Sequence, residues 1–152
     1  MSDAAMIVAG AIACLGLSGA GSALGTGLAA SAAVGAWKKC YAANKPAPFL
    51  LLSFVGAPIT QTLYGMILMF TMLGKVGKVA AGSGVPVLVA GIFARLAIGL
   101  SALFPGRAAA AARDAQAETN QGFTNYLAAI GIVETVAIFA MVFALIALGS
   151  VK

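Results

Sequence analysis

Four long apolar stretches separated by short polar segments dominate the pattern of the chain. They run from about Ala4 to Trp37, from Phe49 to Leu73, from Val85 to about Ala112 and from about Tyr126 to Gly149. A helix needs about 20 mostly apolar residues to cross the ~30 Å hydrocarbon layer of a bilayer, and each stretch exceeds that length. The pattern therefore predicts four transmembrane helices and an all-α membrane protein.

Basic residues in the connections between the stretches predict an orientation. The first and third connections carry five of them, and the second connection and the C-terminus carry three: Lys38, Lys39, Lys45, Arg107 and Arg113 against Lys75, Lys78 and Lys152. Because cytoplasmic loops are enriched in Lys and Arg, this bias places both termini outside.

Composition supports a membrane location. Of the 152 residues, 62% are apolar and 9% are charged, which leaves too few polar side chains to cover a soluble domain and excludes intrinsic disorder. The formal net charge of +5 is scattered and forms no basic patch for nucleic acid. Cys14 and Cys40 are too few for a disulfide scaffold and are interpreted as small hydrophobic residues.

The first apolar stretch is expected to be a helix of the mature protein. A secretory signal is the alternative, because the stretch is N-terminal. No basic residue precedes it, however, and it is longer than the hydrophobic region of a signal peptide.

A faint internal repeat relates the two halves of the chain. Ile59–Thr62 aligns with Ile132–Thr135, and Gly16–Ser18 aligns with Gly99–Ser101. Since each pair falls in corresponding stretches, the repeat predicts a duplicated two-helix hairpin.

The predicted hairpins, residues 4–73 and 85–150, form a single membrane domain over residues 1–152. Gln61 and Glu134 occupy equivalent positions, about half-way along the second and fourth stretches. The duplication thus has one carboxylate, with an amide in the equivalent place of the first hairpin.

Glycine is concentrated in the first stretch, at positions 10, 16, 19, 21, 25, 27 and 35. In lipid, small residues let helix backbones approach closely. An ordinary pair of helices would account for some of these glycines. Their density favours a curved wall of closely packed helices.

Glu134 is the only acidic residue inside an apolar stretch. A charge at that depth costs from about 2.5 kcal/mol upward unless it is paired, protonated or coordinated. Burial favours the neutral acid and a bound cation favours the carboxylate, so Glu134 is suited to reversible binding of H⁺ or Na⁺. A protonated Glu134 that only joins two helices is the alternative.

Three polar residues of the second stretch are expected near Glu134. Thr60, Gln61 and Tyr64 lie within about one helical turn and offer a hydroxyl, an amide oxygen and a phenol. Oxygen ligands suit a hard cation, and the same groups can hydrogen-bond a protonated carboxyl. Simple interhelical hydrogen bonding is the remaining interpretation.

Three segments resemble one protein family. Pro58–Gly65, Gly99–Phe104 and Val133–Phe139 are similar to the proteolipid that forms the membrane ring of bacterial V-type rotary ATPases. The resemblance covers almost the whole chain. It implies a rotor ring of identical subunits in the bacterial plasma membrane, a stator subunit with an essential Arg, and central-stalk subunits. It also implies no cofactor and no catalysis on this chain, because soluble subunits hydrolyse or synthesise ATP.

The resemblance also implies a set of ion ligands. In sodium-pumping members of the family, the positions that match Glu134, Thr60 and Gln61 hold Na⁺, the position of Tyr64 hydrogen-bonds the carboxylate, and the backbone carbonyl at the position of Ala57 contributes. This set gives a slight preference for Na⁺ over H⁺.

The third stretch departs from the family pattern. Pro105 stands before Gly106 and Arg107, where the sodium site of the family has a Gln before Gly-Lys. Pro105 also frees the carbonyl of Ser101 from the helix. We hypothesise that this loosened turn, or a water held there, replaces the missing amide; a tolerated kink is the alternative.

Arg95 lies ~15 Å by helix rise from Pro105, which places it within reach of the membrane interface. We therefore do not assign it to the ion. A stand-alone four-helix cation transporter or pore, and a purely structural membrane scaffold, are the competing functions.

Overall fold

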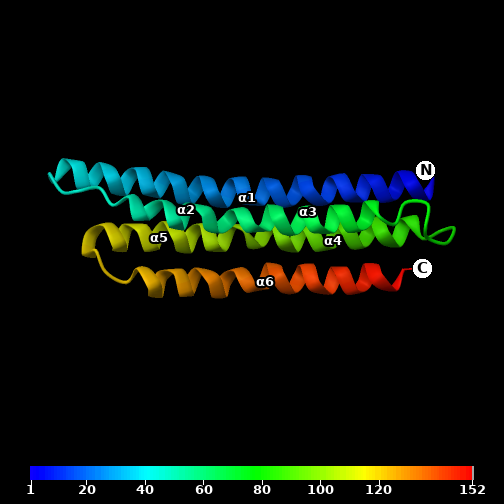
Figure 1. Ribbon diagram of the computed structural model, residues 1–152. Coiled ribbons are helices and arrows are strands. Elements are labelled where there is room, and N and C mark those ends of the chain that lie inside the picture. Colours follow the sequence, from blue (N-terminus) through cyan, green and yellow to red (C-terminus); the bar gives the residue numbers. More distant parts are fainter. Residues whose placement is uncertain (152) are drawn as a thin grey trace.

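The computed structural model describes residues 1–151, and within this range it contains helices and no strands. Four membrane segments run antiparallel to one another, and both termini lie at the same end of the bundle (Figure 1). Four helical spans are long and apolar enough to cross a membrane: Asp3–Ala42, Phe49–Leu73, Gly84–Thr119 and Phe123–Ser150. The predicted all-α, four-helix architecture is confirmed.

The first segment is one continuous helix, α1 (Asp3–Ala42). The Ser2 hydroxyl accepts the N–H of Ala5 at 3.3 Å and caps its start. Its 40 residues correspond to ~60 Å at the rise of an α-helix, about twice the hydrocarbon thickness. α1 is therefore longer than the apolar stretch alone predicts, because the basic residues that follow Trp37 continue the helix.

The second segment is broken into four short elements. They are the 3₁₀ turn η1 (Phe49–Leu52), α2 (Ser53–Gly56), the 3₁₀ turn η2 (Ala57–Ile59) and α3 (Thr60–Leu73). Pro58 has no N–H to donate and disfavours a regular α-helical turn before it. The chain tightens here, and the N–H of Thr60 donates to the carbonyl of Ala57. α3 consequently begins in the middle of an apolar span.

The third segment is interrupted once, between α4 (Gly84–Ser101) and α5 (Leu103–Thr119). The N–H of Ala102 donates to the carbonyl of Gly99 at 3.2 Å, a tight turn three residues ahead of Pro105. α5 continues to Thr119, beyond the predicted end near Ala112. The residues after Ala112 are polar or alanine, and alanine favours the helix, so the helix extends past the end of the apolar stretch.

Left-handed residues turn the chain into the last segment, α6 (Phe123–Ser150). Asn120 has φ 54° and Gly122 has φ 85°, conformations that Asn and Gly adopt at low cost. α6 lies against α3, α4 and α5, while α1 packs on the opposite side of these helices.

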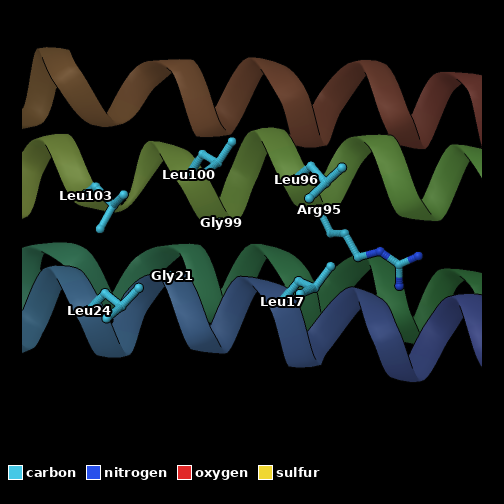
Figure 2. A pocket seen from close by; sticks show the side chains of 8 residues that line it. All are labelled: Leu17, Gly21, Leu24, Arg95, Leu96, Gly99, Leu100 and Leu103. Atoms are coloured by element: carbon cyan, nitrogen blue, oxygen red, sulfur yellow. The ribbon is translucent and has the colours of Figure 1, made fainter.

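Glycines allow α1 to approach α4 and α5 closely. A Cβ atom on Gly21 would overlap the carbonyl of Gly99, and one on Gly106 would lie 2.6 Å from the Cα of Gly25. Figure 2 shows Gly21 on α1 and Gly99 on α4 between the flanking leucines. A second set of α1 glycines has open space around the Cβ position: Gly16, Gly19, Gly27 and Gly35. Intramolecular packing thus explains only part of the glycine content.

Two apolar clusters fill the bundle and leave its middle to smaller and polar residues. The cluster near the termini includes Ile7, Cys14, Leu68 and Leu148. The other cluster, defined by Ala29, Leu51, Phe54, Ala109 and Ile130, lies towards the opposite end. Both cysteines are buried and free, as expected for small hydrophobic residues. On α6, Glu134 falls between the residues that belong to the two clusters.

We expect Gly21→Ala to destabilise the bundle, because the added methyl group meets backbone atoms of Gly99 that cannot rotate away. The free energy of unfolding should fall by about 1–3 kcal/mol, the usual cost of overpacking. Thermal melting of the purified protein in detergent measures this. Gly131→Ala on α6 is the control, since its Cβ position is open; equal melting temperatures for the two variants would contradict the packing argument.

Candidate ion-binding site

One short hydrogen bond connects the second and fourth segments at the middle of the bundle. The hydroxyl of Thr60 donates to Oε1 of Glu134 over 2.7 Å. Thr60 is the first residue of α3, and Glu134 lies near the middle of α6. The predicted neighbourhood of Thr60 and Glu134 is therefore present in the fold.

Further oxygen atoms surround the same hydroxyl. Oγ1 of Thr60 lies 3.3 Å from Oε1 of Gln61 and 3.1 Å from the carbonyl oxygen of Ala57. We call Thr60 Oγ1, Glu134 Oε1, Gln61 Oε1 and Ala57 O the oxygen cluster. The Ala57 carbonyl is oriented by the 3₁₀ turn that Pro58 causes.

The oxygen cluster has more acceptors than protons. A hydroxyl carries one proton and donates one strong hydrogen bond, while three acceptor oxygens face Thr60. A cation among these oxygens, or a proton on Glu134, would relieve the repulsion between them. The arrangement is chemically suited to a hard monovalent cation or to a proton.

Burial differs across the oxygen cluster. Gln61 is fully buried, at 0% exposure, while Thr60 and Glu134 are half-buried. α6 buries the smallest share of its residues among the four spans. The carboxylate thus lies at the edge of the bundle, with the buried Gln61 on the inner side.

Tyr64 lies one turn after Thr60 on α3 and is half-buried against the apolar cluster near the termini. Among residues 1–151, no hydrogen bond joins its hydroxyl to Glu134. Its predicted contact with the carboxylate therefore stays a prediction.

The third segment runs alongside the site. Ser101 and Phe104 share a groove of about 510 Å³ with Ile132, Val133 and Val136 of α6. The Ser101 hydroxyl donates to the carbonyl of Ile98 in its own helix, at 2.6 Å, and Pro105 is buried. In the described part of the chain, neither Ser101 nor Pro105 hydrogen-bonds to Glu134.

The side chain of Arg95 is buried inside the bundle, between α4 and α1. It is 1% exposed, and its Nη1 donates to the carbonyl of Gly10 at 3.0 Å. In Figure 2 its side chain extends from α4 towards α1. The second lone pair of a helical carbonyl can accept this bond. Arg95 takes no part in the oxygen cluster.

Sequence reasoning missed one residue beside the site. The hydroxyl of Ser22 on α1 accepts the backbone N–H of Thr62 at 3.1 Å. Ser18, Ser22 and Thr26 recur every four residues, a spacing that places three hydroxyls along one side of a helix. This row of hydroxyls was the sequence signal that could have indicated a polar contact of α1 near the site.

The donor set also differs from that of a multi-carboxylate or thiolate metal centre. Within residues 1–151, no group of three or more His, Cys, Asp or Glu side chains comes together to hold a metal. A single carboxylate accepts the Thr60 hydroxyl instead, and the Gln61 and Ala57 oxygens lie beside that hydroxyl.

Comparison with known proteins gives a match to one family model. Residues 81–147 match the model that describes the C subunit of ATP synthase. A search of curated proteins found no significant match. The matched range contains Glu134 and ends before the last residues of α6; it excludes the first hairpin, with Thr60 and Gln61.

Members of this family are membrane rotor subunits of rotary ATPases and are not themselves catalytic. They assemble as rings with stator and stalk subunits. The second half of the chain is therefore similar to the C subunit of ATP synthase, and the match supports an ion-translocating proteolipid of a rotary ATPase.

Proposed function

We propose that this protein is the proteolipid subunit of the rotor ring of a V-type ATPase and carries Na⁺ on Glu134. The observation that carries the proposal is the oxygen cluster, in which the Thr60 hydroxyl lies within 3.3 Å of Glu134, Gln61 and Ala57 oxygens. The family match over residues 81–147 supports the rotor assignment. The duplicated hairpins, residues 4–73 and 85–150, favour the V-type over a two-helix subunit.

The site would alternate between two states. In the occupied state, the cation is held by the Glu134 carboxylate and the neutral oxygens of Thr60, Gln61 and Ala57. In the empty state, the Thr60 hydroxyl donates to the carboxylate, as in the present arrangement. A positive side chain, such as the essential Arg of a stator subunit, would compensate the carboxylate while the ion leaves.

The surroundings of the ring follow from the same proposal. Identical copies form the ring, central-stalk subunits attach to it, and the complex lies in the bacterial plasma membrane. Both termini lie outside, so the ends of α1 and α5 that carry Lys39 and Asp114, a 2.7 Å ion pair, face the cytoplasm.

Carbodiimide labelling of Glu134 tests the function. The reagent modifies a protonated carboxyl, so Na⁺ bound at the site should slow the reaction at fixed pH. We expect protection that saturates with sodium in purified rings, and no labelling of Glu134→Gln. Labelling that responds to pH and not to sodium would assign the site to protons. Ion flux through isolated single copies would instead indicate a stand-alone transporter or pore.

Thr60→Val should weaken sodium protection about tenfold or more, because it removes a neutral ligand and a hydrogen bond to a charged group while it keeps the side-chain volume. Thr71→Val is the matched control, since the Thr71 hydroxyl donates to the Ile67 carbonyl within α3, at 2.9 Å. The sodium concentration at half-maximal protection is the measurement. A value for Thr60→Val equal to that of Thr71→Val would remove Thr60 from the site.

Pro105→Gln tests the contribution of the third segment. If the Ser101–Pro105 turn or a water held there stands in for a missing amide, a new Gln side chain at this depth should raise sodium affinity several-fold. The same labelling titration measures it. Unchanged affinity would mean that the third segment does not contact the ion.

A further inference from the structure

The start of α3 raises a hydrogen-bonding problem. α3 begins at Thr60 inside an apolar span, and the residue at its N-cap position is Ile59, which has no side-chain acceptor. The first N–H groups of a helix have no partner in their own helix. Water, which commonly satisfies such groups at a protein surface, is absent from the hydrocarbon layer, so they need a partner within the protein.

α1 supplies that partner. The hydroxyl of Ser22 lies 3.1 Å from the backbone nitrogen of Thr62 and accepts its N–H. Thr62 is the third residue of α3, the position that an N-cap side chain ordinarily serves. Ser22 is 5% exposed, so water does not compete for this bond. A residue of a different segment therefore caps α3.

The contact between α1 and α3 is close at the next turn as well. A Cβ atom on Gly65 would lie 2.6 Å from the Cβ and Oγ of Ser18 and 3.1 Å from the carbonyl of Cys14. The backbone of α3 thus rests directly on α1 through Gly65. Ser22 fixes the first turn, and Gly65 sets the separation of the two helices.

Thr60 and Gln61, the first two residues of α3, come immediately before Thr62 and lie on the side of Glu134. Thr60 and Gln61 contribute two of the four members of the oxygen cluster. If Thr62 moved away from α1, both side chains would shift relative to α6. The position of the ligands consequently depends on a hydroxyl that does not contact the ion.

We propose that Ser22 is a positioning residue of the ion site: by capping α3 from α1, it holds Thr60 and Gln61 at the distance from Glu134 that ion binding requires. The proposal rests on the proposed function, because it concerns the same site. It predicts that loss of the Ser22 hydroxyl weakens ion binding without removing any ligand.

Ser22→Ala in the assembled ring tests the proposal with two measurements. Hydrogen exchange of the peptide that contains Thr62 should accelerate roughly tenfold, because its N–H loses its acceptor. The sodium concentration that half-protects Glu134 from carbodiimide should rise roughly tenfold. If wild-type rings respond to protons only, the pH at half-maximal labelling replaces sodium as the measurement and should shift.

Ser18→Ala is the matched control. Ser18 is one turn away on α1, is fully buried and has a hydroxyl without a hydrogen-bond partner in the described residues. The same atom is deleted, so any general effect of a smaller side chain appears in both variants. Ser22→Thr, which keeps the hydroxyl, should restore binding. If Ser22→Ala prevents ring assembly, Ser22→Cys, with a weaker acceptor of similar size, should give a smaller shift in the same direction.

Two results would overturn the proposal while the function stands. One is unchanged exchange at Thr62 in Ser22→Ala. The other is accelerated exchange with ion protection equal to that of Ser18→Ala, which would make Ser22 a cap with no influence on the ligands. Failure of the proposed function has a different signature, since wild-type rings would then show no protection of Glu134 by sodium or by pH.

Discussion

Hydrocarbon offers no hydrogen bonds, and this constraint organises the middle of the bundle. Each polar group there must find its partner in the protein. Pro58 breaks the second segment and releases backbone groups at the depth of Glu134. The Ala57 carbonyl then accepts the backbone N–H of Thr60, and the Ser22 hydroxyl accepts the N–H of Thr62. A break of this kind would weaken a helix in a soluble protein. Here it lies at the level of the oxygen cluster and contributes the Ala57 carbonyl to it.

Packing supports the site from both ends. Apolar clusters occupy the two ends of the bundle, and small residues fill the level between them. Gly21 and Gly25 let α1 approach α4 and α5, so that little side-chain volume separates the backbones. In lipid, such close contacts replace the hydrophobic gain that drives association in water. The oxygen cluster thus lies at a level of the bundle where helices pack through their backbones.

Much of this arrangement could be predicted from the sequence, because its signals are strong and local. Apolar length gave the four spans, and a lone acid among apolar residues pointed to Glu134. The interruption of the helix at Pro58 and the burial of Arg95 between α4 and α1 were not predicted. The break is a local effect of Pro58, whereas the burial of Arg95 depends on a partner from a distant segment, because the Gly10 carbonyl accepts an N–H of its guanidinium. The role of Ser22 likewise becomes visible only when α1 and α3 are side by side. Its spacing with Ser18 and Thr26 predicts a row of hydroxyls on one side of a helix but does not say which group they contact.

Glu134 and the other members of the oxygen cluster belong to different segments, and α6, which carries Glu134, is the span least enclosed by its own bundle. One flank of the Glu134 carboxylate is therefore left for surrounding lipid or an adjacent molecule to cover. Under the proposed function, how firmly the ion is retained then becomes a property of the ring. A single copy in detergent would then release the proposed ion more readily than a copy enclosed by its neighbours in the ring.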